Sequence, residues 1–396
     1  MVPSMEAACV LYLDQTVIEL MENFTMRTFS RSNFVRFGLL SLFSVLAASL
    51  CNRVKAGSMS ETKVKASRLK TLSKGINMGP LQKHGLVAEA TLQEYKNLGL
   101  TYTRIFIKLS EFFDDNNPSV LKTDSLDVLD ELIKTHVKTG VGITVSPTDS
   151  PPELYSNPDT VAKFVAFFKA FATHLSSTNP EIVFLEVMNE PNAPTVQDWN
   201  KVQHQLISAI RSQAPNHTII ASSNVSLSAN DWNELGAFPM TQVVADKNVV
   251  YNFHCYEPIV FTHQGATWGW NGSKFIKDIP YPSTPEVVAP LLDTIQDAEA
   301  KVAVEKYGKE RWNRNKYVSI LSPIANWAKI NKVPVICNEF GAIFWTAPRN
   351  SRLRYLKDIR EVFDSYGIGW AEYFVDSDVH DNEAIRALGL KPSIHV

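Results

Sequence analysis

Short apolar runs alternate with longer amphipathic segments from Ser73 onward, a pattern typical of repeated βα units. The apolar runs predict eight strands, at residues 75–79, 101–107, 141–146, 182–190, 218–222, 249–256, 333–338 and about 369–374. The amphipathic segments predict helices at about 91–98, 125–139, 159–175 and 196–213. Eight strands with helices between them indicate an α/β fold, a (β/α)₈ TIM barrel. An open doubly wound sheet is the alternative.

One connection between predicted strands is much longer than the others. It runs from about Glu257 to Lys332, between the sixth and seventh strands. It contains a loop with two tryptophans, Thr262–Trp270, and a helical insertion from about Pro285 to Arg311. Because loops this long in compact domains are usually functional, we expect this connection to contribute to the function of the protein.

The first 58 residues do not follow the βα pattern. Arginines precede an apolar stretch, Phe37–Leu50, that is too short to span a bilayer comfortably, and small residues follow it. We therefore expect a leader at 1–58 with a signal-peptide-like segment at about 26–56, cleaved after Ala47, Ala48 or Ala56. The catalytic barrel would occupy 59–396, and the protein would be secreted or periplasmic. An uncleaved membrane anchor is the alternative.

Composition and charge exclude several other classes of protein. The chain has 396 residues, is 45% hydrophobic and 20% charged, and has a net charge of −2. This balance gives no electrostatic basis for binding nucleic acid or an anionic membrane. Outside the leader only Cys255 and Cys337 remain, and we expect both to be small buried side chains rather than a disulfide or metal site. No zinc spacing or phosphate-binding glycine loop is present.

Two predicted strands end in the same way, with an Asn-Glu pair. The fourth ends in Asn189-Glu190-Pro191, where proline cannot continue a sheet ladder, and the seventh ends in Asn338-Glu339. In a barrel, the carboxyl ends of the strands converge on one cleft, so the two glutamates would face each other across it. Two facing carboxyl groups are what glycosidic bond cleavage requires.

With these segments in place, the chain resembles glycoside hydrolase family 5, the cellulase-type retaining β-glycosidases. The resemblance runs from about Lys74 to Leu390 and rests on Val187–Pro191, Ile336–Gly341, Phe253–Pro258 and Arg104. It implies that Glu190 is the general acid/base and Glu339 the nucleophile, with no metal or organic cofactor.

The neighbouring residues fit those roles. Asn189 could bond a sugar 2-hydroxyl. Arg104 could keep Glu339 ionised. Tyr256 resembles the family tyrosine whose hydroxyl bonds the nucleophile, and His254 resembles the family histidine beside it in the cleft. Glu190 needs a proton near neutral pH, so we expect its surroundings to raise its pKa.

Two positions depart from the family pattern. Ser146 stands where the family usually has a histidine after the third strand, and Tyr373 stands where it usually has a sugar-stacking tryptophan. Trp370, three positions before Tyr373, would lie in the barrel wall. Trp268 and Trp270 either stack on sugars in outlying subsites or pack on the insertion helix. These departures affect the identity of the substrate more than the mechanism.

These observations predict a monomeric glycosidase that cleaves a β-linked glucan, in the first place an endo-β-1,4-glucanase acting through a glycosyl-enzyme intermediate. A β-mannanase, a β-1,3-glucanase or an exo-acting β-glucosidase on the same scaffold are alternatives. A non-catalytic carbohydrate-binding protein on a hydrolase-like barrel is an alternative of another class. A metal-dependent barrel enzyme is disfavoured, because no convergent ligands appear in the sequence.

Overall fold

A computed structural model describes residues 62–81, 87–228, 232–373 and 380–392 of the chain. The predicted leader, including its cleavage sites and Cys9 and Cys51, lies outside these residues. The chain divides into the units Met1–Met59 and Ser60–Val396, and the second contains every element described below. None of the helices in the described ranges is long and apolar enough to cross a bilayer.

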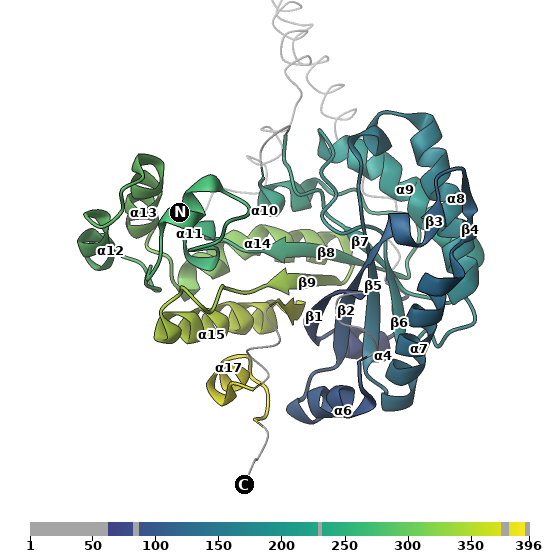
Figure 1. Ribbon diagram of the computed structural model, residues 1–396, viewed down its shortest axis with the longest axis horizontal. Coiled ribbons are helices and arrows are strands. Elements are labelled where there is room, and N and C mark those ends of the chain that lie inside the picture. The colour runs from purple at the N-terminus through teal and green to yellow at the C-terminus, as the bar shows by residue number, and fades with distance from the viewer. Residues whose placement is uncertain (1–61, 82–86, 229–231, 374–379, 393–396) are drawn as a thin grey trace, which may run out of the picture. The chain divides into compact units, whose positions relative to one another are not determined.

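Eight parallel strands close into a barrel in the order β1-β10-β9-β8-β7-β6-β5-β2 (Figure 1). Their bounds are β1 Lys74–Pro80, β2 Tyr102–Lys108, β5 Gly142–Thr148, β6 Val183–Glu186, β7 Ile219–Ser222, β8 Val249–Cys255, β9 Val335–Phe340 and β10 Gly369–Glu372. The first strand pairs with both the second and the last, which leaves no open edge among them. The predicted (β/α)₈ barrel is therefore confirmed, and the doubly wound alternative is excluded.

The strand β6 is shorter than the predicted run 182–190 and ends at Glu186. Beyond it the backbone still bonds the neighbouring strands at two points: the Val187 N–H donates to the Ile220 carbonyl of β7 at 2.9 Å, and the Asn189 N–H donates to the Pro147 carbonyl of β5 at 2.7 Å. Glu190 then adopts a left-handed conformation with φ 45°, which is uncommon for a residue other than glycine. The side chain of Glu190 is thus presented by a strained turn rather than by the strand itself.

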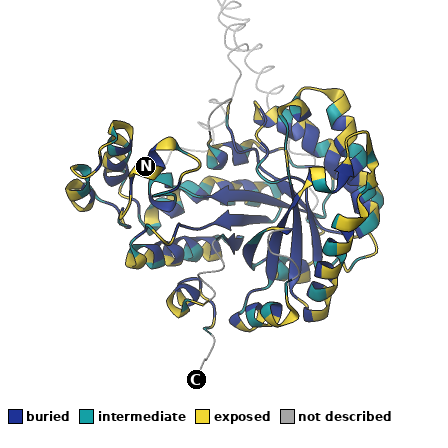
Figure 2. Ribbon diagram, in the orientation of Figure 1, coloured by how far each residue is buried: buried dark blue, intermediate teal, exposed yellow. Residues whose placement is uncertain are grey.

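Helices cover the outside of the barrel, with buried residues toward the strands and exposed residues outward (Figure 2). Their bounds are α4 Ala66–Thr71, α6 Glu89–Leu98, α7 Thr123–Thr139, α8 Pro158–Leu175, α9 Val196–Gln213, α10 Glu234–Ala237, α15 Arg349–Tyr366 and α17 Asn382–Ala387. The four predicted helices correspond to α6, α7, α8 and α9. Three of them start one or two residues earlier than predicted, and α9 matches its predicted bounds.

Five helices occupy the connection between β8 and β9. They are α11 Ile259–Thr262, η5 Asn271–Phe275, α12 Pro285–Leu292, α13 Ala298–Glu310 and α14 Arg314–Asn331. The helical insertion predicted at about 285–311 consists of the two helices α12 and α13. The second begins after Asp297, whose side chain accepts a hydrogen bond from the Ala300 N–H. A small hairpin of β3 Phe113–Asp114 and β4 Asn117–Leu121 after β2 was not predicted.

The barrel interior is built in layers. An apolar layer contains one side chain from each of several strands: Tyr102, Phe184, Ile220, Val250, Ile336 and Ala371. Because strand side chains alternate, the residues two positions further along point into the same interior. These are polar and buried: Arg104, Glu186, Ser222, Asn252, Asn338. The barrel therefore has an apolar layer beneath a polar layer, and the polar layer lies toward the carboxyl ends of its strands.

Trp370 on β10 is fully buried, with its ring edge against Phe340, as predicted for a wall residue. Cys255 and Cys337 lie on the neighbouring strands β8 and β9, and both are buried and unlinked. The prediction that they are small buried side chains is confirmed.

Candidate active site

Arg104 on β2 is the centre of the polar layer and is completely buried. Its guanidinium holds the Glu186 carboxylate through two parallel bonds, from Nε to Oε2 at 2.7 Å and from Nη2 to Oε1 at 2.8 Å. Glu186 also accepts hydrogen bonds from the side-chain amides of Asn338, at 3.0 Å, and Asn252, at 3.4 Å. A buried carboxylate is costly unless it is paired, and Glu186 is paired on both oxygens.

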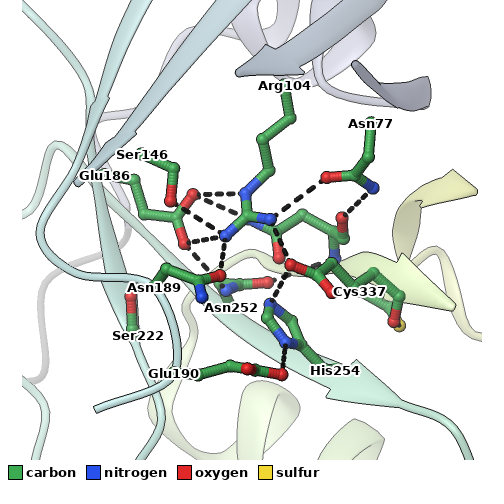
Figure 3. A network of polar contacts seen from close by, with 12 residues as sticks. Asn77, Arg104, Ser146, Glu186, Asn189, Glu190, Ser222, Asn252, His254 and Cys337 are labelled. Atoms are coloured by element: carbon green, nitrogen blue, oxygen red, sulfur yellow. Dashed lines mark hydrogen bonds and ion pairs between the residues drawn. The ribbon is translucent and has the colours of Figure 1, made fainter. Parts of the chain in front are cut away.

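The other donors of Arg104 reach four further side chains, most of them visible in Figure 3. Nη1 donates to Glu339 Oε1 at 2.5 Å and to Asn77 Oδ1 at 3.1 Å. Nη2 donates to Ser146 Oγ at 2.9 Å and to Asn189 Oδ1 at 2.8 Å. Burial works against the charge of Arg104, but the carboxylates of Glu186 and Glu339 more than offset it and raise its pKa. The guanidinium is a fixed positive charge.

Glu339 on β9 is also buried, and both of its oxygens have partners. Arg104 occupies Oε1, and the Tyr256 hydroxyl donates to Oε2 at 2.9 Å. Burial and the charge of Glu339 raise the pKa of Tyr256 well above its usual value, so the phenol keeps its proton and remains a donor. Glu339 is held in one orientation by a cation on one side and a phenol on the other.

Glu190 faces this pair across His254, which lies on β8 opposite Glu339 in the strand register. His254 Nδ1 lies 2.9 Å from Glu190 Oε1, and Nε2 lies 3.7 Å from Glu339 Oε1. Burial disfavours the imidazolium, but the charges of Glu339, Glu234 and Glu190 outweigh it and raise the pKa of His254 to about 9. His254 is thus a cation between two carboxylates.

The expected raised pKa of Glu190 is wrong for this structure. Burial does raise the pKa of the carboxyl group, but the hydrogen bond and the charge of His254 more than reverse that effect, and the net pKa is lowered. The sequence motif placed His254 in the site but did not reveal its contact with Glu190.

One oxygen of Glu190, one of Glu339 and a ring nitrogen of His254 lie within 4.8 Å of one another. Three such ligand atoms could in principle hold a metal ion. The Arg104 guanidinium, however, contacts the Glu339 carboxylate directly and would repel a divalent cation there. The arrangement fits a pair of working carboxyl groups better than a metal centre.

Glu234 on α10 supports the site from behind and was not singled out in the sequence. Its Oε1 accepts the His254 backbone N–H at 3.0 Å and the Ser223 hydroxyl. Burial raises its pKa to about 8, against the opposing effect of the His254 charge. Glu186, Asn77 and Asn252 were missed as well. The signal for Glu186 is a carboxylate inside an otherwise apolar strand, which must find a buried cation.

The two departures from the family pattern both lie at the site. Ser146 accepts from Arg104, so its hydroxyl completes the guanidinium's set of partners. Tyr373 follows β10, its N–H donates to the Phe340 carbonyl at 2.8 Å, and its ring centroid lies 6.3 Å from that of Phe106. Burial raises the pKa of Tyr373, and the nearby charge of Glu339 adds to that effect.

The two loop tryptophans differ in their surroundings. Trp270 donates its ring N–H to Glu299 of α13 at 2.8 Å and packs against the main hydrophobic core. Of the two roles predicted for it, packing on the insertion helix is therefore the one that the structure shows. Trp268 is 51% exposed and lies beside another exposed ring, Trp345.

A sequence model of the cellulase family, glycosyl hydrolase family 5, matches residues 64–378. The chain belongs to glycosyl hydrolase family 5. As a family member it is a glycosidase, a cellulase-like hydrolase on a TIM barrel. The family implies a polysaccharide substrate.

Two curated relatives and one solved structure illustrate this membership. Endoglucanase 3 of Fibrobacter succinogenes is 30% identical over 225 residues, which are 55% of this chain and 33% of that protein. Endoglucanase C of Acetivibrio thermocellus is 22% identical over 309 residues, 75% of this chain and 87% of that protein. The crystal structure of Thermotoga maritima Cel5A in complex with mannotriose has a TM-score of 0.66 and 22% identity, over 81% of this chain and 98% of that one. That likeness shows the fold.

Proposed function

We propose that this family 5 enzyme cleaves a β-linked glucan with retention of configuration, as an endo-β-1,4-glucanase. The observation that carries the proposal is the close approach of Glu190 and Glu339, in which one carboxyl oxygen of each residue lies within 4.8 Å of one from the other. Retaining glycosidases hold their two carboxyl groups about 5–5.5 Å apart, whereas inverting enzymes leave about 6.5–9.5 Å for a water molecule.

In the first step Glu339 is the nucleophile. Its carboxylate oxygen attacks the anomeric carbon while the bond to the leaving oxygen breaks, and Glu190 gives its proton to that oxygen. The products of the step are a glycosyl ester on Glu339, a free sugar end and an ionised Glu190. Arg104 and Tyr256 hold Glu339 aimed at the anomeric carbon and disperse its charge.

In the second step Glu190 acts as the base. It takes a proton from a water molecule, whose oxygen attacks the anomeric carbon and releases Glu339 as a carboxylate. Two inversions give net retention, and Glu190 regains its proton. His254 contacts Glu190 and lies near Glu339, so its charge stabilises the ionised form of each carboxylate as it appears.

Two other residues would hold the sugar. The amide oxygen of Asn189 accepts a hydrogen bond from Arg104, so the amide N–H groups of Asn189 can donate to a 2-hydroxyl. Tyr373, half-buried near Glu339, can place its ring against the sugar face in the position where the family usually has tryptophan.

The endo-β-1,4-glucan assignment is supported by the names of the curated relatives, both endoglucanases. A β-mannanase is the second candidate, because Thermotoga maritima Cel5A carries mannotriose in its structure. β-1,3-Glucanase and exo-β-glucosidase activities are further candidates, and the shared barrel scaffold is their only support. A purely sugar-binding role is disfavoured because the groups needed for catalysis are linked to one another. Arg104 bonds Glu339 directly, and His254 contacts Glu190 and lies near Glu339.

A mutational test distinguishes the two carboxyl groups. Glu190→Gln and Glu339→Gln should each abolish release of reducing sugar from carboxymethylcellulose or mannan. Azide should partly restore cleavage of an activated aryl glycoside by the Glu190→Gln variant, because an activated leaving group needs no proton and azide needs no base. It should not restore the Glu339→Gln variant. Wild-type turnover by either variant would refute the assignment.

A further inference from the structure

The strand that carries His254 extends further than its neighbour on one side. β8 continues to Cys255, whereas β7 ends at Ser222, which is paired with Asn252. The Ser223 N–H still donates to the Asn252 carbonyl at 3.0 Å. Beyond this bond β7 has ended, so the His254 N–H needs a different partner, because a buried N–H that lacks one is costly.

Glu234, the first residue of α10, is that partner. Its Oε1 accepts the His254 N–H at 3.0 Å and also the Ser223 hydroxyl. One oxygen therefore joins the residue that follows β7 to the residue of β8 that enters the site. On the opposite side, His254 is paired in register with Glu339 of β9. Glu234 thus takes the place of a strand neighbour and holds His254 in position from the β7 side.

The end of β7 also holds the loop that carries Glu190. The Ser222 hydroxyl donates to the Met188 carbonyl, and the Val225 N–H donates to the Pro191 carbonyl at 2.9 Å. These two bonds lie on either side of Glu190, whose φ of 45° is uncommon for a residue other than glycine. The strained turn is therefore fixed both before and after the carboxyl group that it presents.

The start of α10 is bonded to the same residues. The Asn233 N–H donates to the Val225 carbonyl at 2.9 Å, and the Asn233 side chain caps α10. This bond brings Glu234 next to the residues that hold the Glu190 loop. Residues from the end of β7 and the start of α10 therefore set the positions of both partners in the Glu190–His254 contact of 2.9 Å (Figure 3).

We propose that Glu234 is a positioning residue for the general acid/base: it fixes His254 at the point where the imidazole contacts Glu190. This inference rests on the proposed function. Glu190 must give its proton in the direction of the leaving oxygen, and His254 is the partner of one of its oxygens. A displaced imidazole would leave the Glu190 carboxyl group free to turn, and general acid catalysis depends on that orientation.

The protonation of Glu234 suits this role. Burial raises its pKa to about 8, against the opposing effect of the His254 charge, so the group is largely protonated at neutral pH. A protonated carboxyl group still has one oxygen that can accept both bonds. Glutamine keeps such an oxygen, whereas methionine keeps the length of the side chain and removes both oxygens.

The test compares two leaving groups in the full-length protein. Phenyl β-cellobioside needs a proton on its leaving oxygen, whereas 2,4-dinitrophenyl β-cellobioside does not, because its phenolate is stable without one. Glu234→Met should therefore lower kcat/KM about thirtyfold on the phenyl glycoside and no more than about threefold on the dinitrophenyl glycoside. Glu234→Gln should restore most of the loss. A residue that merely stabilised the fold would affect both substrates alike.

Two further variants control for stability. Asp358→Asn alters another buried carboxyl group, on the outer helix α15, where it accepts the Tyr281 hydroxyl at 3.0 Å. It should change both activities by the same factor. Ser223→Ala removes one of the two bonds to Glu234 and should lower activity on the phenyl glycoside alone, by a smaller factor, even if Glu234→Met does not fold. Equal losses on both substrates, or no loss on either, would overturn the positioning role.

Crystal structures separate this inference from the proposed function. If the wild type cleaves neither aryl glycoside, the structures of the wild type and of Glu234→Met or Ser223→Ala decide. A His254–Glu190 separation beyond hydrogen-bond reach, about 3.5 Å, in the variant supports the positioning role, and an unchanged contact overturns it. Failure of the wild type on carboxymethylcellulose and mannan as well would refute the proposed function, whatever the contact shows.

Discussion

Arg104 positions more side chains of the site than any other residue described. Its five N–H groups are directed to two carboxylates, a hydroxyl and two amide oxygens, so that rotation of the guanidinium would break several bonds at once. Glu186 accepts the bonds along the Nε edge of the guanidinium. The remaining bonds go to Glu339, Asn189, Ser146 and Asn77. The orientation of the proposed nucleophile therefore depends on a second carboxylate that never touches the sugar.

Glu186→Gln should lower kcat far more than it changes KM, because Gln cannot hold the guanidinium by two charged bonds. It should also reduce the free energy of unfolding by about 3 kcal/mol, since removal of one partner from a buried pair leaves charge uncompensated. Urea unfolding and steady-state kinetics measure the two effects. Glu305→Gln, in an exposed pair with Lys309, is the matched control and should leave both unchanged. A Glu186→Gln enzyme with normal kcat would contradict this role.

His254→Gln should move the high-pH limb of kcat/KM to higher pH. Glu190 must be protonated to act as the acid, and His254 lowers its pKa by a hydrogen bond and a positive charge. With a neutral side chain in that position, burial is the largest remaining influence and raises the pKa, so the proton is kept to higher pH. A pH–rate profile on an aryl cellobioside checks the shift, with His204→Gln on α9 as control. An unmoved or more acidic limb would count against the pairing.

At the scale of elements, the strands were predictable because buried parallel strands form apolar runs. The exceptions have physical causes. The predicted run 182–190 continued past Glu186 because Val187 and Met188 are apolar and as buried as the strand residues. The Val187 N–H also still bonds the Ile220 carbonyl of β7. The hairpin β3–β4 was missed because it is short and largely exposed, so no alternation marks it. Glu234 could not be inferred, since only the folded chain brings it behind His254.

Trp270→Ala tests how the loop that carries Trp268 is anchored. It removes a ring packed on the core and a bond to α13, so the free energy of unfolding should fall by about 2 kcal/mol. Urea unfolding measures this change. An unchanged stability would mean that the ring does not anchor the loop.

At the scale of the whole molecule, the residues that stabilise the barrel interior and the residues of the proposed active site occupy different layers. The apolar layer from Tyr102 to Ala371 closes the interior below, and the buried polar layer that contains Arg104 and Glu186 lies two positions further along the same strands. The sequence located Glu190, Glu339, Arg104, His254 and Tyr256 because they lie in segments that resemble the family motifs. The residues that tune them lie outside those segments. Glu186 is the last residue of β6 and is marked only as a carboxylate in an apolar run, and Glu234 lies on the short helix α10, where no sequence pattern marks it.

Export of the chain remains a proposal, and it predicts a shortened mature protein. Arginines followed by an apolar stretch and small residues should direct cleavage after Ala47, Ala48 or Ala56. Intact mass and amino-terminal sequencing of protein recovered outside the cytoplasm would locate the new end. Leu46→Arg should abolish processing, whereas Leu11→Arg, before the arginines, should not. A full-length protein that stays membrane-bound would favour the anchor instead.

The central claim is that Glu190 and Glu339 act as a retaining pair, and the configuration of the first product tests it most directly. Proton NMR during hydrolysis of a cello-oligosaccharide should show the β-anomer of the released sugar first, with the α-anomer appearing only as the product mutarotates. An α-anomer that appears first would mean inversion, and would contradict a covalent intermediate on Glu339.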